Sequence, residues 1–484
     1  SFALSADTLG DKSVAIGVAA LAAQNFTSAT NTYNTAVGWN AGLSVTTATN
    51  GTFIGGLAGD AVTTGASNTF VGQASGSSTT TGAQNVAVGE GALFTNTTAS
   101  SNTAIGRDAM YYNTTGTLNT AVGHSAGKDL TTGDSNTFIG KGSGENTTTA
   151  DHNTAVGRDA LFTNTTGTQN VALGTAAMYY TTTGSQNTAV GTNALDKNTT
   201  AGTNVAVGYQ AMFDNTTGAN NVAVGYLALG NNTTAAGNSA VGYKALEDCT
   251  VGHSNAASGA YALSNLTDAD YNTCHGYGAG SQVTTGSANV YIGYNSASHS
   301  TLTTTGSENT LVGSYTDTTA VGTSSANGFG HDIAAEASYT TLGVGANDIR
   351  AAHGNTTWST VSDERYKKDI VDSTAGLSFI NALKPRTFKY KNLGELPETF
   401  RAYKAGSTDV FKNSNTNHGF IAQEVKTAID ADSGIKDGFK LWDDREDGSQ
   451  EVAEAALIPV LTKAVQELST ALDAALARIA TLEG

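Results

Sequence analysis

Proline is scarce in this chain, and its position is informative. The sequence has 484 residues and only 3 prolines, Pro385, Pro397 and Pro459, all near the C-terminal end. The long stretch before them is rich in Gly, Asn, Thr and Ala. A disordered linker of that composition usually contains proline freely. We therefore expect regular structure that uses every backbone N–H.

Positive charge is also sparse. The chain has 24 Lys and Arg against 41 Asp and Glu, a formal net charge of −17, with few basic residues before residue 350. This distribution offers no basic patch, so nucleic acid and anionic membrane are excluded as main partners. No apolar run is long enough to span a bilayer, so we expect no membrane insertion.

Cysteine occurs only at Cys249 and Cys274. Two cysteines make neither a disulfide framework nor a cysteine-based metal cluster. We expect two free thiols, and we predict no metal and no cofactor.

The abundant feature is a repeat. Asparagine, followed three residues later by an aliphatic residue and then by glycine, occurs at Asn34, and again one residue out of phase at Asn50. From Asn68 the motif keeps a period of 17 residues, and Asn309 follows after an insertion. The asparagines in phase are Asn68, Asn85, Asn102, Asn119, Asn136, Asn153, Asn170, Asn187, Asn204, Asn221, Asn238, Asn255, Asn272 and Asn289.

The repeat predicts a mainly β fold. Each unit is too short for a helical hairpin, and its β-branched residues and regular glycines favour strands and tight turns. We therefore predict a β-solenoid of 17-residue coils over residues 1–325, in phase from residue 68 to residue 305, and a connecting neck over residues 326–357. Asn68 and its equivalents should form an asparagine ladder.

Two adjacent apolar columns predict the number of chains. Successive residues of a strand point to opposite faces. We expect one column to face a dry interior, namely Val71, Val88, Ile105, Val122, Ile139, Val156, Leu173, Val190, Val207, Val224 and Val241. We expect the preceding column to face sister chains, namely Phe70, Ala87, Ala104, Ala121, Phe138 and Ala155. A coil this small encloses little core, so we predict a homotrimer.

The repeat resembles the Asn-x-Ala-Val-Gly coils in the heads of trimeric autotransporter adhesins and in many phage fibres. The resemblance covers residues 13 to 322, although those adhesin heads typically use a shorter coil. It implies a trimeric left-handed β-roll that serves display and adhesion.

Aromatic residues recur at two positions of the coil. One set follows the motif glycine, at Tyr209, Tyr226, Tyr243, Tyr277 and Tyr294, and Ala260 interrupts it. The other set follows the Leu or Met position, at Phe94, Tyr111, Phe162, Tyr179 and Phe213. Such ladders suit contact with a carbohydrate receptor, and they equally suit packing within the solenoid.

The composition changes at Trp358, where charge, proline and amphipathic patterning begin. We assign residues 358–484 to a separate α+β domain that ends in a trimeric coiled coil over residues 455–483. Its apolar seam has alternate spacings of three and four residues, and it comprises Ile458, Leu461, Val465, Leu468, Leu472, Ala475, Ile479 and Leu482. A single amphipathic helix packed on a globular core is the alternative.

This domain resembles a known family. Its motifs are Ser-Asp-Glu-Arg-Tyr-Lys from Ser362, Leu-Lys-Pro-Arg-Thr-Phe from Leu383 and Gly-Phe-Ile-Ala-Gln-Glu-Val from Gly419. They are similar to the intramolecular chaperone domain of phage endosialidases and other tail spikes, the S74 peptidase domain. The resemblance implies a domain that trimerises the chain, templates folding of the upstream β-structure and cuts itself off before the motif serine.

The residues permit that cut. Ser362 and Lys367 are five residues apart, and a lysine acts as general base when burial leaves its amine neutral. The Ser362 hydroxyl would attack the carbonyl of Val361, and water would hydrolyse the resulting ester. Lys368 is the competing base. The predicted activity is a single-turnover, intramolecular serine endopeptidase with no external substrate.

The sequence thus predicts a phage tail-fibre-like protein on the virion surface that binds a host receptor. Its expected partners are two further copies of the chain, a cell-surface glycan or protein, and other virion tail proteins. A bacterial trimeric surface adhesin with the same C-terminal module is one alternative, and a polysaccharide-degrading tailspike is another.

Overall fold

The computed structural model describes residues 2–299, 304–355, 357–360, 362–435 and 439–483. The chain divides into two compact units, residues 1–361 and residues 362–484. The first unit is a β-solenoid, and the second is a small domain with both helices and strands. The predicted β-solenoid and the following α+β domain are therefore confirmed, while the number of chains stays a prediction.

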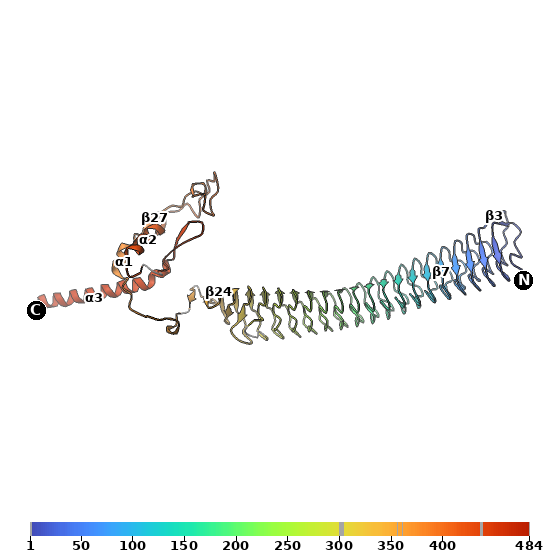
Figure 1. The fold of residues 1–484 in the computed structure, drawn as a ribbon, viewed down its shortest axis with the longest axis horizontal. Helices are drawn as coiled ribbons and strands as arrows, with labels where there is room; N and C mark the ends of the chain where they lie inside the picture. The colour runs from blue at the N-terminus through green and yellow to red at the C-terminus, as the bar shows by residue number, and fades with distance from the viewer. Residues whose placement is uncertain (1, 300–303, 356, 361, 436–438, 484) are drawn as a thin grey trace. The chain divides into compact units, whose positions relative to one another are not determined.

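The first unit is a stack of coils, each of which adds one short strand to a parallel sheet (Figure 1). The register confirms the 17-residue coil, because Thr137 pairs with both Thr120 and Thr154. The three-residue strands are β2 (Val14–Ile16), β4 (Thr35–Val37), β5 (Thr52–Ile54), β6 (Thr69–Val71), β7 (Val86–Val88), β8 (Thr103–Ile105), β9 (Thr120–Val122), β10 (Thr137–Ile139), β11 (Thr154–Val156), β12 (Val171–Leu173), β13 (Thr188–Val190), β14 (Val205–Val207), β15 (Val222–Val224), β16 (Ser239–Val241), β17 (Ala256–Ser258), β18 (Thr273–His275), β19 (Val290–Ile292) and β20 (Thr310–Val312).

Shorter and later strands complete this unit. β1 (Gly10–Asp11) pairs with β3 (Thr30–Asn31), and β21 (Asp317–Thr318) pairs with β23 (Ala334–Ala335). The main sheet continues past β20 through β22 (Asn327–His331) and β24 (Tyr339–Val344) in parallel, and then through β25 (Asn347–Ala352) and β26 (Ser359–Thr360) in antiparallel order. The predicted neck is thus largely strand.

The asparagine ladder closes each coil and joins it to the next. The backbone N–H of Asn153 donates to Oδ1 of Asn136 over 3.0 Å, and Nδ2 of Asn153 donates to the carbonyl of Gly167 over 2.9 Å. Oδ1 of Asn153 in turn accepts from the backbone of Asn170 over 3.0 Å. These buried amides are satisfied by hydrogen bonds, so their burial is not penalised.

The motif that seemed out of phase at Asn50 keeps its register. Gly51 occupies the ladder position there, and its backbone N–H donates to Oδ1 of Asn34 over 2.8 Å. Thr52 pairs with Thr35, so β5 is in step with β4. The asparagine of this coil lies one residue earlier than in the other coils, but the strand keeps its register.

The predicted directions of the two apolar columns were wrong. The middle residue of every strand from β4 to β20 is buried, including Phe70, Ala87 and Phe138. The column beginning Val71 points outward, and Ile139 and Val241 are 39% and 43% exposed. The coil is so narrow that the inward position mostly takes alanine, and the larger β-branched residues lie on the outer face.

Large inward residues are matched by glycine on the other side of the coil. A Cβ on Gly144 would come within 2.5 Å of the Phe138 ring, and one on Gly76 would meet the Phe70 ring at the same distance. Most coils with an inward alanine instead carry Leu or Met at the position of Gly144, such as Leu161, whereas the coils of Ala36 and Ala121, which each precede a phenylalanine coil, carry glycine there. The glycines thus leave room for the phenylalanine rings, as a close-packed core requires.

The second unit surrounds a small core of its own. Its helices are α1 (Leu377–Ala382), α2 (Ala422–Ala431) and α3 (Leu457–Glu483), and its strand pairs are β27 (Arg386–Phe388) with β28 (Asn417–Gly419) and β29 (Trp442–Asp444) with β30 (Gln450–Val452). Phe379, Val425, Ile429, Leu441 and Val460 form the centre of this core. Within the described part of the chain, none of the helices has the length and apolarity that a membrane span requires.

Candidate self-cleavage site and exposed surfaces

Ser362 and Lys367 are brought together by one short turn. The side chain of Asp363 caps the 3-10 helix η1 (Glu364–Tyr366), accepting from the backbone N–H of Arg365 over 2.8 Å. The chain turns back through η1, and Nζ of Lys367 donates to Oγ of Ser362 over 2.7 Å. A nucleophile and a base in direct contact are the first requirement for activation of a serine.

Asp363 and Arg365 hold this turn. The Arg365 guanidinium donates to both carboxylate oxygens of Asp363, over 3.0 and 2.6 Å. These bonds and the backbone N–H of Arg365 hold the pKa of the Asp363 carboxyl below its ordinary value. The carboxylate therefore stays ionised and keeps capping η1, which fixes the spacing between Ser362 and Lys367.

The exposure of this pair is important for its chemistry. Ser362 and Lys367 are both exposed to solvent in the single chain. A lysine general base has to lose its proton, which is favoured when the ammonium is removed from water. As described, the pair lacks the burial that such a base requires. Val361, the residue whose carbonyl is predicted to be attacked, lies outside the described residues.

Residues 362–433 match the model of the Peptidase_S74 family, the chaperone of endosialidase. The matched region begins at Ser362 and includes all three motifs quoted above. The comparisons with curated proteins and with solved structures gave no match. We call residues 362–433, which match this model, the endosialidase-chaperone region.

An ion pair within the endosialidase-chaperone region joins two of its motifs. Arg386 of β27 donates to both carboxylate oxygens of Glu424 in α2, over 2.9 and 2.6 Å. This bidentate contact lowers the pKa of Glu424. Both residues belong to quoted motifs, and the contact gives those residue types a structural role away from Ser362.

Helix α3 presents two apolar faces. Leu457, Val460 and Ala464 are buried in the core of the second unit. The predicted seam lies on a different face, and all of its residues are exposed, from Ile458 to Leu482. Leu476, which the seam did not include, is also exposed beside it. In the single chain the core of the second unit therefore contacts another face of α3 and leaves the seam exposed.

A hydrogen bond also joins α3 to α1 within the same unit. Oε2 of Glu467 accepts from the backbone N–H of Leu377 at the start of α1, over 2.8 Å. A Cβ on Gly376 would lie 2.5 Å from this carboxylate, so a larger residue there would require the Glu467 side chain to move. The sequence spacing of 90 residues gave no sign of this pairing.

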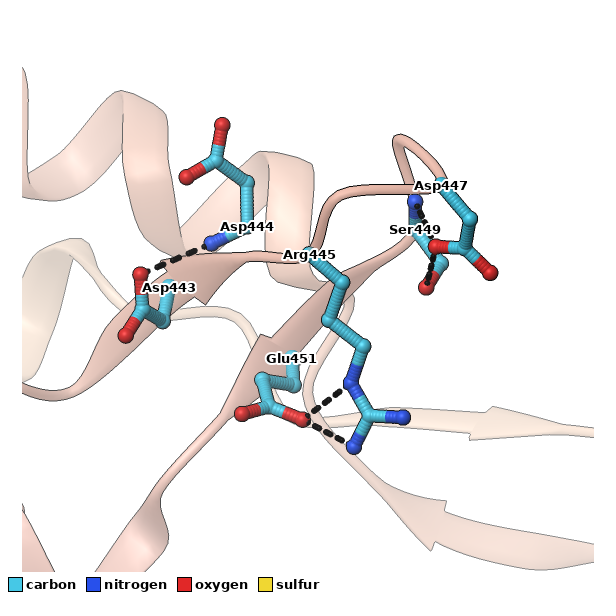
Figure 2. A network of polar contacts seen from close by, with 6 residues as sticks. All are labelled: Asp443, Asp444, Arg445, Asp447, Ser449 and Glu451. Carbon is cyan, nitrogen blue, oxygen red and sulfur yellow. Dashed lines mark hydrogen bonds and ion pairs between the residues drawn. The ribbon is translucent and has the colours of Figure 1, made fainter. Parts of the chain in front are cut away.

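The acidic run after Leu441 is a stabilised hairpin. Figure 2 shows Arg445 reaching across to Glu451, while Asp443 and Asp444 point away from Asp447. Asp447 accepts from the backbone N–H groups of Arg401 and Ser449, which lowers the pKa of its carboxyl to about 2. Among the described residues, no group of three or more His, Cys, Asp and Glu is arranged to hold a metal ion.

The tyrosine row on the solenoid is longer than the sequence predicted. Tyr209, Tyr226 and Tyr243 stack nearly parallel at 5.4 and 5.1 Å, and each is exposed. Tyr261 fills the gap left by Ala260, meeting Tyr243 edge to face at 5.2 Å. The row continues through Tyr277, Tyr294 and Tyr315. The sequence contains a signal for the added members: Tyr261 and Tyr315 each lie two residues after a motif glycine, in coils that have no tyrosine directly after that glycine.

The second aromatic set forms pairs rather than a continuous row. Phe94 stacks on Tyr111 at 4.8 Å, and Phe162 stacks on Tyr179 at 4.9 Å. Phe213 instead lies under the ammonium of Lys197 at 4.8 Å. Because stacked rings cover one another's faces, these residues offer a partner mainly their edges.

Proposed function

We propose that this chain is a phage tail-fibre-like protein that binds a host receptor, and that its second unit assembles the fibre and then cuts itself off. In this proposal the endosialidase-chaperone region drives trimerisation and folding of the solenoid. The bond between Val361 and Ser362 is then cleaved. The observation that carries the proposal is the contact between Lys367 and Ser362 at the start of the matched region.

The chemistry of the cut follows from this contact. Lys367, once neutral, accepts the proton of the Ser362 hydroxyl, and Oγ forms a bond to the carbonyl carbon of Val361. The Val361–Ser362 peptide bond then breaks, and the freed amine of Ser362 takes up the proton. Water hydrolyses the ester, which leaves residues 1–361 with a new carboxylate and restores the serine hydroxyl. Because Ser362 and Lys367 are exposed in one chain, assembly would supply the burial that starts the reaction.

The exposed seam of α3 supports trimerisation. A 27-residue helix with an apolar row along its outer face is unfavourable in water, and association with equivalent helices would cover that row. We propose a coiled coil of three helices, one from each chain of the proposed fibre. The fibre would be part of the virion tail and contact other tail proteins at an end.

Receptor contact is proposed for the tyrosine row. Its tyrosines are exposed on successive coils between Tyr209 and Tyr294. Such a surface suits a glycan or a surface protein. The two alternatives, a bacterial trimeric adhesin and a polysaccharide-degrading tailspike, would use the same scaffold.

The tailspike alternative requires a pair of catalytic acids. Asp108 and Asp159 occupy equivalent positions three coils apart, about 14 Å at the spacing of neighbouring strands. Glycosidase carboxylates are separated by roughly 5 to 9.5 Å. Each of these two aspartates also pairs with the arginine beside it. These two aspartates are therefore not a glycosidase pair.

The direct test of the cut is a pair of serine variants. We expect the parent to give two fragments on a denaturing gel and Ser362→Ala to remain full length, because no nucleophile is left. Ser359→Ala, which removes an exposed serine of β26, is the matched control and should be cut like the parent. Lys367→Arg should also stay full length, whereas Lys368→Arg should be cut. Equal cleavage of the parent and Ser362→Ala would refute the mechanism.

A further inference from the structure

The outer side of the solenoid sheet is an uncharged surface of constant composition. The first and third residues of each strand from β4 to β20 point outward, on either side of the buried middle residue. We call these two columns the aliphatic face. The first column is mostly Thr and Val, the third is mostly Val and Ile, and neither contains Asp, Glu, Lys or Arg.

This face is accessible in the single chain. Ile105, Ile139 and Val156 are 39%, 39% and 37% exposed, and Val241 is 43% exposed. Surface strands of soluble proteins normally place polar or charged residues outward. The turns of the same coils do carry charge, as at Lys197 and Asp214. An uncharged surface with an apolar row that runs from β4 to β16 marks a site of interaction.

The period of the face indicates what covers it. Its columns repeat every 17 residues of sequence and about every 4.8 Å along the stack. A globular partner with a standard interface of about 800 Å² would cover only a few coils. A partner that covers the whole face must repeat with the same spacing, and another copy of this solenoid does so.

We infer that the aliphatic face is the surface through which copies of this chain pack against one another, in parallel and in register. This inference rests on the proposed trimer, and it replaces the column that the sequence had assigned to sister chains. Parallel packing follows because the α3 seams of all copies lie at the same end of the chain. Equivalent valines and isoleucines would then meet at the same height.

The face is most uniform from β4 to β16. The third residue of each of these strands is Val, Ile or Leu. The column is then interrupted by Ser258 in β17 and His275 in β18, and it resumes at Ile292 in β19. The packing between copies should therefore be closest along the first part of the solenoid. The tyrosine row begins two residues after this column, beyond the motif glycine, as at Val207 and Tyr209.

Two single-cysteine variants of one coil test the inference. Val156→Cys places a thiol on the aliphatic face, and Thr166→Cys places one at an exposed position in the turn of the same coil. Each full-length protein is treated with a short bis-maleimide and run on a denaturing gel, while light scattering measures its mass in solution. Cys249 and Cys274 are buried, and burial raises the pKa of Cys249 to about 12, so the parent should not be linked.

We expect covalent dimers with Val156→Cys at a yield roughly tenfold or more above that with Thr166→Cys, because packed copies give facing thiols a high effective concentration. A trimer in which position 156 links no better than position 166 would overturn this inference and leave the proposed function standing. A monomer in light scattering would overturn the proposed trimer and this inference together.

Discussion

At the scale of single residues, the motif glycines are fixed by their neighbours. Gly208 has φ +136, and a Cβ there would lie 2.5 Å from the carbonyl oxygen of Gly225 in the next coil. Both the backbone conformation and the contact exclude a side chain. The column thus sets how closely successive coils can stack.

Gly208→Ala should therefore destabilise the solenoid by roughly 1 to 3 kcal/mol or more, since strain and a backbone clash add together. Gly56→Ala is the matched control, because a Cβ there meets nothing closer than the carbonyl oxygen of Trp39 at 4.0 Å. Denaturant unfolding followed by circular dichroism measures both. Equal stability of the two variants would contradict this account of the glycine column.

A buried carboxyl makes the solenoid sensitive to pH. Burial raises the pKa of Asp196 to about 6, with Lys197 acting in the opposite direction. An acid whose pKa is higher in the folded than in the unfolded state destabilises the fold when it is ionised. This penalty is complete above about pH 6 and disappears as the pH falls toward the ordinary value of 3.8.

Asp196→Asn should accordingly raise the free energy of unfolding at pH 7.5, by at most about 3 kcal/mol. The gain should shrink between pH 6 and pH 4, where the parent carboxyl becomes protonated. Thermal unfolding midpoints of both proteins at pH 7.5, 5 and 4 provide the comparison. The idea fails if the gain is the same at pH 4 as at pH 7.5.

At the scale of one coil, side chains from two positions fill the same part of the interior. Phe138 fills the space above Gly144, and the equivalent pair in the following coil is Ala155 and Leu161. Leu161 has φ +54 and Gly144 has φ +59, so the backbone at this position accepts a leucine. The two kinds of coil are alternative solutions to the same interior.

Phe138→Ala should cost about 3 to 5 kcal/mol, since it leaves a cavity with no compensating residue. The double variant Phe138→Ala with Gly144→Leu recreates the composition of the following coil and should recover much of that loss. Gly144→Leu alone should destabilise, because Leu and Phe would compete for one space. Independent, additive effects in denaturant unfolding would argue against the shared volume.

The coil also shows what the sequence could predict. The 17-residue period, the asparagine ladder and the parallel register follow from the repeat itself, because stacked coils place equivalent residues side by side. The direction of the apolar columns did not follow. Alternation indicates that Phe70 and Val71 lie on opposite faces, but the width of the coil, set by its turns, decides which face is inside.

The candidate site was predictable to a similar degree. The motif indicated Ser362 and Lys367, and their contact depends on a local turn that Asp363 caps. Long-range contacts such as Glu467 with Leu377 had no periodic or motif signal. The row predicted from the sequence lacks Tyr261 because it follows a single coil position, whereas side chains from neighbouring positions can meet in space.

At the scale of the whole molecule, each of the two units has an exposed surface that association with other copies would cover. The solenoid has an uncharged outer face that other copies would cover, and the second unit has an exposed seam on α3. The endosialidase-chaperone region starts at Ser362, where the second compact unit also starts. A cut before Ser362 would therefore separate the two units without breaking either one.

Size-exclusion chromatography with light scattering, combined with intact mass measurement, tests this central claim most directly. For freshly expressed Ser362→Ala we predict a particle of about three times the 49.1 kDa chain mass, with every chain intact. For the parent we predict a trimer whose solenoid chains have the mass of residues 1–361. A parent that remains a monomer of 49.1 kDa, or one whose chains end at another residue, would contradict the account.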